Sequence, residues 1–144
     1  MTAKDFFSKE EQKQIVEAIK AAENLTSGEI RVHIENHCKE EILDRTTFLF
    51  SKMGMHKTEL RNGVLIYLAV KDRQFSIVGD AGINSKVADN FWDEITASTI
   101  AHFKEGNYST GLCEAIKQCG EKLVEYFPVA EDDVNELSDD ISFG

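Results

Sequence analysis

The stretch of sequence that decides the fold is Arg61–Asn84, RNGVLIYLAVKDRQFSIVGDAGIN. It holds a seven-residue apolar run, Val64–Val70, between a polar turn and the charged turn Lys71–Gln74. A run that is rich in Val, Ile, Leu and Tyr and too short for a typical helix predicts a strand buried on both faces. The next apolar segment, Phe75–Val78, predicts an antiparallel partner for that strand.

The chain before this hairpin predicts a helix, a strand and a second helix. Ser8 and Glu11 form a capping-box pattern, and apolar residues at helical spacing follow, which predicts a helix over about 9–24. Glu29–Glu35 alternates polar and apolar residues, which predicts a strand near a sheet edge with its charged side chains on a wetter face. Periodic apolar residues then predict a helix over about 39–53, which Gly54 ends.

Two more helices are expected after the hairpin. Asn84 or Ser85 caps the first, and Ser109 caps the second, which Pro128 ends. The order α-β-α-β-β-α-α predicts an α/β fold, a Rossmann-like mixed sheet with helices packed on it. The two strands that flank the second helix should be parallel, joined by a right-handed crossover.

Length and composition indicate one domain. The chain has 144 residues, of which 42% are hydrophobic, and a net charge of −10. We expect the domain to span 1–128, followed by a mobile acidic tail, 129–144, with six acidic side chains and no Lys or Arg. The absence of a basic stripe argues against nucleic acid and anionic membranes as partners, since both require positive charge. A divalent cation suits this negative net charge, and an unidentified protein is the alternative partner.

Cysteines and apolar runs indicate the compartment. The three cysteines show neither metal-ligand spacing nor a disulfide framework, as expected for free thiols in a reducing compartment. The first twelve residues hold no apolar core of a secretion signal, and nowhere do about 18 apolar residues run together. We therefore expect a cytoplasmic protein that does not contact a membrane.

The predicted topology gathers acidic and amide side chains at one end of the sheet. Parallel strands start at the same end and the antiparallel strand finishes there, so Glu29, Asn62 and Asp80 should converge, with Asn84 nearby. Calcium takes about six to eight oxygen ligands, so these four residues form a candidate metal site, for calcium rather than magnesium. Residue types alone favour a structural alternative, in which Glu29 is a solvated strand residue and Asp80 shapes the turn.

Four motifs, in this order, resemble the TPM domain family. They are SGEIRV at Ser27–Val32, NGVLI at Asn62–Ile66, GDAGI at Gly79–Ile83 and FKEGNY at Phe103–Tyr108. The resemblance covers about 9–126, most of the chain, and implies an α/β sandwich with a Rossmann-like sheet. The family was long classed as a domain of unknown function, and it includes thylakoid-lumen proteins described as acid-phosphatase-like and many bacterial proteins.

The resemblance implies two candidate functions: a divalent-cation site in acidic loops at one end of the sheet, and weak metal-assisted hydrolysis of phosphate esters. By position, Glu29, Asn62 and Asp80 match the family's pattern, and Asp72 matches its hairpin acid. Asp80 is the candidate catalytic residue, and it stands where many members carry an aromatic residue. Cationic side chains that could hold a phosphate are few, since only Arg61 and Lys86 lie near the predicted cluster. We therefore expect a cation-binding or protein-interaction module, and at most a weak phosphatase.

Overall fold

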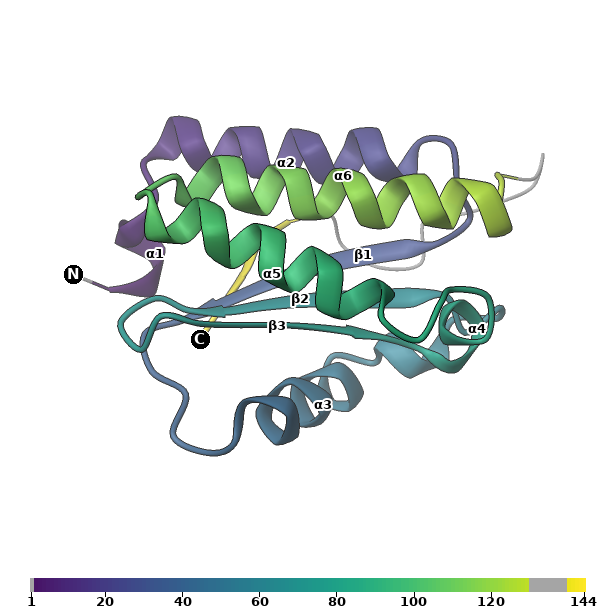
Figure 1. Cartoon of the computed structure of the whole chain (residues 1–144), viewed down its shortest axis with the longest axis horizontal. Coiled ribbons are helices and arrows are strands. Elements are labelled where there is room, and N and C mark those ends of the chain that lie inside the picture. The colour runs from purple at the N-terminus through teal and green to yellow at the C-terminus, as the bar shows by residue number, and fades with distance from the viewer. Residues whose placement is uncertain (1, 130–139) are drawn as a thin grey trace.

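The computed structural model describes residues 2–129 and 140–144. The elements are α1 (Ala3–Phe6), α2 (Lys9–Glu23), β1 (Glu29–Glu35), α3 (Ile42–Lys52), η1 (Met55–Lys57), β2 (Gly63–Ala69), β3 (Gln74–Gly79), α4 (Ala81–Asn84), α5 (Phe91–Lys104), α6 (Tyr108–Tyr126) and β4 (Ser142–Phe143). The strands form one mixed sheet in the order β3-β2-β1-β4. Helices α2, α5 and α6 cover one face of the sheet, and α3 lies on the other (Figure 1). The predicted α/β class and mixed sheet are confirmed.

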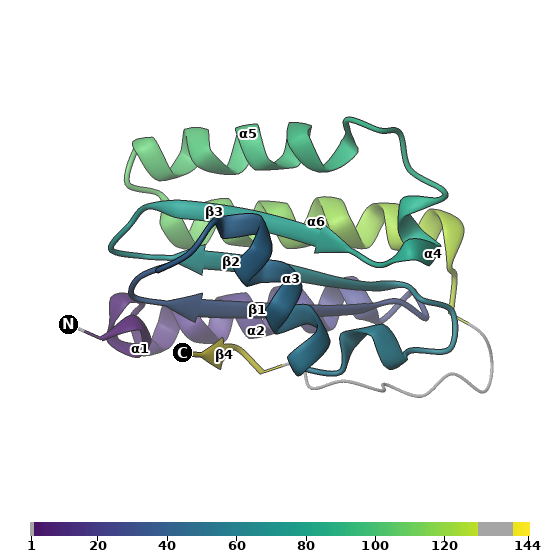
Figure 2. The same cartoon turned by 90° about the horizontal axis from the view of Figure 1, so that it is seen from below.

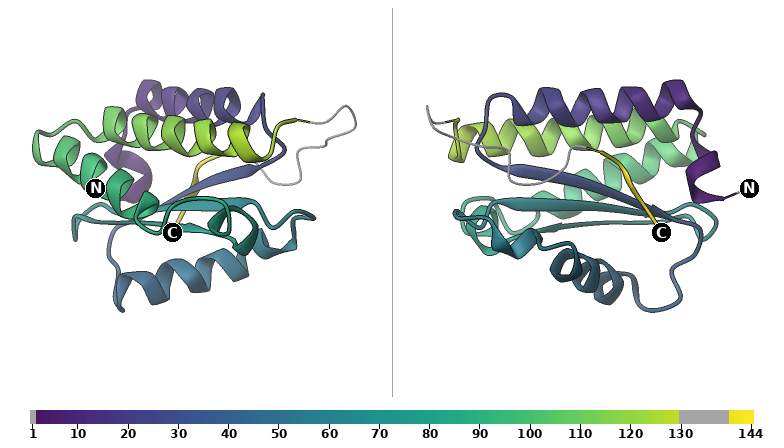
Figure 3. Two further views of the ribbon diagram at one scale, coloured as in Figure 1. Left: turned by 45° about the vertical axis from the view of Figure 1, so that its right-hand side comes forward. Right: turned by 180° about the vertical axis from the view of Figure 1, so that it is seen from behind.

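Strand β2 lies at the centre of two apolar layers. It runs parallel to β1, with Glu29 opposite Gly63, and antiparallel to β3, with Val64 opposite Gly79. All its residues are buried, because alternate side chains enter two different clusters. Ile66 belongs to the larger cluster, to which α2, α5 and α6 contribute, whereas Tyr67 belongs to the smaller one with α3. The ribbon shows these helices on opposite faces of the sheet (Figure 3). The predicted strand directions and the burial of both faces are confirmed.

Helix α2 begins and ends close to its predicted bounds. The Ser8 hydroxyl accepts a hydrogen bond from the Glu11 amide at 3.0 Å, and the Ser8 amide donates to the Glu11 carboxylate at 2.9 Å. This capping box satisfies backbone donors that the first helical turn would leave unpaired. Ile15 and Ile19 then enter the larger apolar cluster, on the face of the sheet that α6 also covers.

The helix boundaries after the hairpin differ from the prediction. Asp80 caps a short helix, α4, and α5 begins only at Phe91, so neither Asn84 nor Ser85 caps the long helix. The reason is local: the Asn84 amide group donates to the Gly79 carbonyl at 2.8 Å and closes the turn on itself. Helix α6 begins at Tyr108, so Ser109 lies inside its first turn rather than at its cap.

The expectation that β1 carries a wetter charged face is wrong. Glu29, His33 and Glu35 on that face are only 2%, 5% and 6% exposed. Helix α3 lies over the sheet on this side, and β4 adds a further strand beside β1 (Figure 2). The ionisable side chains of β1 therefore lie in the interior, where each needs a polar partner.

The last residues of the predicted tail form a strand. Ser142 and Phe143 form β4, which pairs parallel to β1, and Ile141 and Phe143 pack against the larger apolar cluster. The rest of the predicted tail, 130–139, lies outside the residues that the structure describes. Over 2–129 and 140–144, no helix is both long and apolar enough to cross a bilayer.

Candidate functional site

The predicted convergence at one end of the sheet is present in the backbone. The Asn62 carbonyl accepts a hydrogen bond from the Glu29 amide at 3.3 Å, and the Gly63 carbonyl accepts one from the Asp80 amide at 2.9 Å. Glu29 and Asp80 therefore flank Gly63 from its two neighbouring strands. Side chains of paired residues point to the same face of a sheet, so the alternation places both carboxylates on the face that α3 covers.

Backbone oxygens approach this end of the sheet closely. A Cβ atom at Gly63 would lie 3.0 Å from the Met55 carbonyl oxygen, so that oxygen lies against Gly63, between the two carboxylate positions. A Cβ atom at Gly82 would lie only 2.2 Å from the Leu60 carbonyl oxygen. Glycine at both positions lets the loop over 55–61 bring carbonyl groups next to the acidic side chains.

Asp80 is a buried and ionised carboxylate. Its Oδ2 atom accepts from Arg61 Nε at 2.6 Å, and its Oδ1 atom accepts from Arg61 Nη2 and the Ala81 amide, both at 2.8 Å. Burial raises the pKa of this carboxyl, but the bonds from Arg61 and the Ala81 amide outweigh that effect and hold the pKa below its usual value. The turn-shaping role expected from residue type is therefore present, together with an ion pair that the sequence did not predict.

The two predicted amide ligands differ in how they are used. Asn62 donates from its Nδ2 atom to the Ser27 hydroxyl at 3.3 Å, and among residues 2–129 and 140–144 no donor bonds its side-chain oxygen. Asn84 uses both ends of its amide group, because Nδ2 donates to Gly79 and Oδ1 accepts from Trp92 Nε1 at 2.8 Å. Asn62 can therefore turn an oxygen toward a cation, whereas Asn84 serves as a clamp between α4 and α5.

A metal at this end would depend on neutral oxygens as well as carboxylates. Within the described parts of the chain, no three His, Cys, Asp or Glu side chains gather closely enough to hold an ion. Glu29 and Asp80 supply two carboxylates, and Asn62 and the Met55 carbonyl supply neutral oxygens. Such a set fits calcium, whose coordination is flexible and includes backbone carbonyls and water, better than zinc or a rigid octahedral ion.

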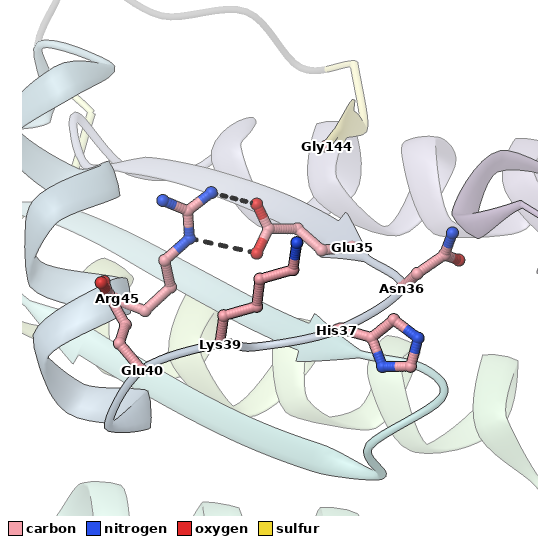
Figure 4. A pocket seen from close by; sticks show the side chains of 7 residues that line it. All are labelled: Glu35, Asn36, His37, Lys39, Glu40, Arg45 and Gly144. Carbon is pink, nitrogen blue, oxygen red and sulfur yellow. Dashed lines mark hydrogen bonds and ion pairs between the residues drawn. The ribbon is translucent and has the colours of Figure 1, made fainter.

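A second polar group lies at the opposite end of β1, beside a hollow of about 460 Å³. Figure 4 shows Arg45 reaching from α3 to the Glu35 carboxylate, with His37 and Lys39 on the connecting loop. Arg45 Nε donates to Glu35 Oε2 at 3.1 Å, and Nη2 donates to Oε1. The Tyr67 hydroxyl donates to the same carboxylate at 2.6 Å.

These bonds fix the charges of the second group. Burial opposes ionisation of Glu35, yet the bonds from Arg45, Tyr67 and His33 lower its pKa to about 2. Burial also lowers the pKa of His33, although the Glu35 carboxylate opposes that shift. This group was not predicted from the sequence. Tyr67 could have signalled it, because a tyrosine in a strand that is buried on both faces needs a hydrogen-bond partner for its hydroxyl.

The hairpin acid Asp72 ties the loop after β1 to the hairpin. Its Oδ1 atom lies 2.8 Å from His37 Nδ1, and its Oδ2 atom accepts from the Cys38 amide at 2.6 Å. The Cys38 thiol donates instead to the Glu40 carbonyl at 3.2 Å. His37 and Cys38 therefore share a structural anchor and do not form a nucleophile–base pair.

Comparison with known proteins points to one family. The model of the TPM domain matches residues 1–122. The BA42 protein of the psychrophilic bacterium Bizionia argentinensis is 46% identical, with a TM-score of 0.90 over 97% of both chains. The N-terminal domain of a protein from P. gingivalis is 20% identical, with a TM-score of 0.73 over 88% of this chain and 84% of that one. The N-terminal domain of cg2496 from Corynebacterium glutamicum is 16% identical, with a TM-score of 0.60 over 82% of this chain and 74% of that one. No curated protein matches the chain.

Proposed function

Because the chain belongs to the TPM domain family, and its acidic end is rich in oxygens, we propose that it binds a divalent cation there. Calcium is the preferred ion. The ligand set is the carboxylates of Glu29 and Asp80, the amide oxygen of Asn62 and the Met55 carbonyl, completed by water. Asn84 belonged to the predicted set but is left out, because its oxygen already accepts from Trp92.

The observation that carries this proposal is the guanidinium group on Asp80. Arg61 places a positive charge against a carboxylate that is only 6% exposed, while the Arg61 side chain itself remains 52% exposed. The acidic end is thus already complementary to a cation. Because the Arg61 side chain is half exposed, a divalent ion that takes its place on Asp80 can release the guanidinium group into water.

The test is calcium-dependent thermal unfolding of the full chain after treatment with a chelator. A ligand that binds only the folded state raises its stability, by about 2.7 kcal/mol at a concentration of 100 times Kd. We expect a saturable rise in Tm for the wild type, and none for Asp80→Asn or Glu29→Gln. Asp93→Asn and Glu17→Gln are matched controls, since both side chains are exposed on other helices, and they should keep the rise. Equal rises in all five proteins would reject this site.

Hydrolysis of phosphate esters is the second candidate function, and one observation favours it. The half-exposed Arg61 lies beside Asp80, so a phosphate could meet a cation and a nucleophile together. Only slow turnover is expected, since both Asp80 oxygens are already bonded. Release of p-nitrophenol from its phosphate ester, measured with calcium or magnesium, tests this activity. Turnover that persists in Asp80→Asn would exclude Asp80 as the nucleophile.

A further inference from the structure

A hollow of about 480 Å³ lies at the end of the sheet opposite Asp80, on the side that α5 and α6 cover. The turn between β2 and β3 and the link from α5 to α6 both reach this end of the molecule (Figure 1). Small-molecule sites usually measure roughly 300–1,000 Å³, so the hollow has room for a ligand. The residues that line it are Arg73, Ile100, Phe103, Lys104, Gly106 and Tyr108.

Four of these residues belong to the motif FKEGNY, 103–108, which the proposed cation site does not use. Gly106 reverses the chain between α5 and α6 from a left-handed backbone conformation, φ 81°. Its amide donates to the Phe103 carbonyl at 2.9 Å, and the Asn107 amide donates to the His102 carbonyl at 3.0 Å. These two bonds form a Schellman motif, which fixes the end of a helix. The motif therefore brings the end of α5 and the start of α6 to one hollow.

Phe103 and Tyr108 form an aromatic wall of the hollow. Their rings are stacked, with centroids 4.9 Å apart and an angle of 20° between the planes. Phe75 meets Phe103 edge-on at 5.5 Å, and Phe6 meets Tyr108 edge-on at 5.0 Å. Because these four rings come from four different elements, the wall is held firmly in place. A flat ring that enters the hollow can extend this row in the edge-to-face geometry that aromatic rings prefer.

Two cationic side chains also line the hollow, Arg73 from the turn and Lys104 from α5. Both residues are exposed, and over 2–129 and 140–144 neither side chain forms a hydrogen bond or an ion pair. The lining includes no Asp or Glu side chain. The hollow is therefore positively charged within a chain that has 26 acidic residues against 16 Lys and Arg. This charge favours an anion as the ligand.

Arg73 has a backbone conformation that suits glycine better than arginine. Its φ is 55°, in the left-handed region. Within the described parts of the chain, no contact of the guanidinium group offsets this strain. An anion in the hollow would supply such a contact, because the guanidinium fork binds the oxygens of an anionic group through two N–H donors.

We propose that this hollow binds a small aromatic anion, a flat ring that carries an anionic group. The ring packs against Phe103 and Tyr108, and the anionic group accepts hydrogen bonds from Arg73 and Lys104. An inorganic anion would leave the aromatic wall without a contact, and a neutral ring would leave both cations without a partner. The hollow is separate from the proposed cation site, because Arg73 precedes β3 and Asp80 follows it.

The test is an amide-resolved NMR titration of the calcium-free full chain with 2-naphthoate, a flat two-ring carboxylate. We expect saturable shifts at Arg73, Lys104, Gly106 and Tyr108. Arg73→Gly and Lys104→Gln should each raise Kd by about three- to tenfold, because each removes a charge-assisted bond to the carboxylate. Lys71→Gln is the matched control, since it removes an exposed cation of the same turn that does not line the hollow, and it should leave Kd unchanged.

Two further ligands separate the ring from the charge. Acetate carries the charge without the ring, and 2-naphthylmethanol carries the ring without the charge, so each should bind at least about tenfold more weakly than 2-naphthoate. A neutral ring that binds as tightly as 2-naphthoate, or an equal Kd in wild type and both variants, would overturn the proposal. Shifts confined to the apolar groove between α2 and α6, at Ala22 and Val124, would also overturn it.

Discussion

Arg61 and Asp80 pair across the end of the sheet, with Arg61 Nε 2.6 Å from Asp80 Oδ2 and Nη2 2.8 Å from Oδ1. Arg61 makes this contact from a left-handed backbone conformation, φ 53°, which non-glycine residues rarely adopt. Its carbonyl also accepts from the Gly82 amide at 2.8 Å, so the turn and the ion pair hold the same two segments together. In the proposed function, this arginine is the positive charge that calcium replaces.

Removing that charge should strengthen calcium binding. In Arg61→Gln, the ion no longer competes with a guanidinium group for Asp80, so we expect Kd for calcium to fall by about three- to tenfold. Isothermal titration calorimetry measures the change. Arg73→Gln is the matched control, because Arg73 has the same backbone conformation, φ 55°, at the opposite end of β3 and should leave Kd unchanged. Weaker binding in Arg61→Gln would mean that the arginine supports the site instead of occupying it.

The close approach of the loop to α4 makes Gly82 intolerant of a side chain. A Cβ atom would lie 2.2 Å from the Leu60 carbonyl oxygen and 2.5 Å from that of Arg61, and backbone atoms cannot rotate away. We expect Gly82→Ala to lower the free energy of unfolding by roughly 2–4 kcal/mol in a urea titration. Gly106→Ala, at a left-handed φ of 81° with nothing within 4 Å, should cost about 1 kcal/mol. A smaller loss for Gly82 than for Gly106 would contradict the packing described.

Glu35 should make stability depend on acid pH. The pKa of its carboxyl is lowered from 4.5 to about 2 in the fold, so the folded state binds fewer protons than the unfolded chain. The contribution of Glu35 to the free energy of unfolding is complete above pH 4.5 and is lost as the pH falls toward about 2. At pH 7, Glu35→Gln should unfold with roughly 2–3 kcal/mol less free energy, because Arg45 loses its buried partner.

Comparing the stability of wild type and Glu35→Gln across pH tests whether the loss comes from the ionised Glu35 carboxylate. Urea titrations of wild type and Glu35→Gln should give curves that converge as the solution is acidified through the window between pH 4.5 and about 2. Glu17→Gln, an exposed substitution on α2, is the control for a general effect of lost charge. A difference that stays constant down to pH 2.5 would show that packing, not ionisation, explains the loss.

The hairpin turn offers a stabilising substitution. Arg73 holds a left-handed conformation in the turn between β2 and β3, where its side chain is exposed. Glycine adopts this conformation without a steric penalty, so Arg73→Gly should raise the free energy of unfolding by about 0.5–1 kcal/mol. The same change at Gln74, a strand residue, should lower it. A fall in Tm for Arg73→Gly in a thermal melt would contradict this expectation. It would show that the Arg73 side chain adds more stability than its left-handed backbone conformation costs.

The central hairpin and its parallel neighbour could be predicted because their signals are local. The composition of the apolar run Val64–Val70 is enough to predict a strand that is buried on both faces, and the turns on either side predict where this strand begins and ends. Strand directions followed from the helix between β1 and β2, which in turn brought Glu29, Asn62 and Asp80 to one end. Nothing in these steps required knowledge of distant contacts.

The remaining features depend on residues far apart in the chain. The ionisable face of β1 has the sequence pattern of a solvated face, but α3 covers it in the fold (Figure 2). Its side chains bond Arg45 on α3 and Ser142, which is more than a hundred residues away from His33. Helix α4 and strand β4, of four and two residues, are too short for any periodicity to reveal. The Arg61–Asp80 pair requires a left-handed backbone at Arg61, and residue type gives no signal for it.

The most direct test of the cation site is an amide-resolved NMR titration of the full chain with calcium, and with magnesium as a control. The account predicts saturable shifts at Glu29, Gly63 and Asp80–Gly82, with the Arg61 side-chain Nε resonance moving as its bond to Asp80 breaks. Magnesium should produce smaller shifts at the same positions. Shifts confined to the acidic residues after Val129, or growing linearly without saturation, would contradict a site at this end of the sheet.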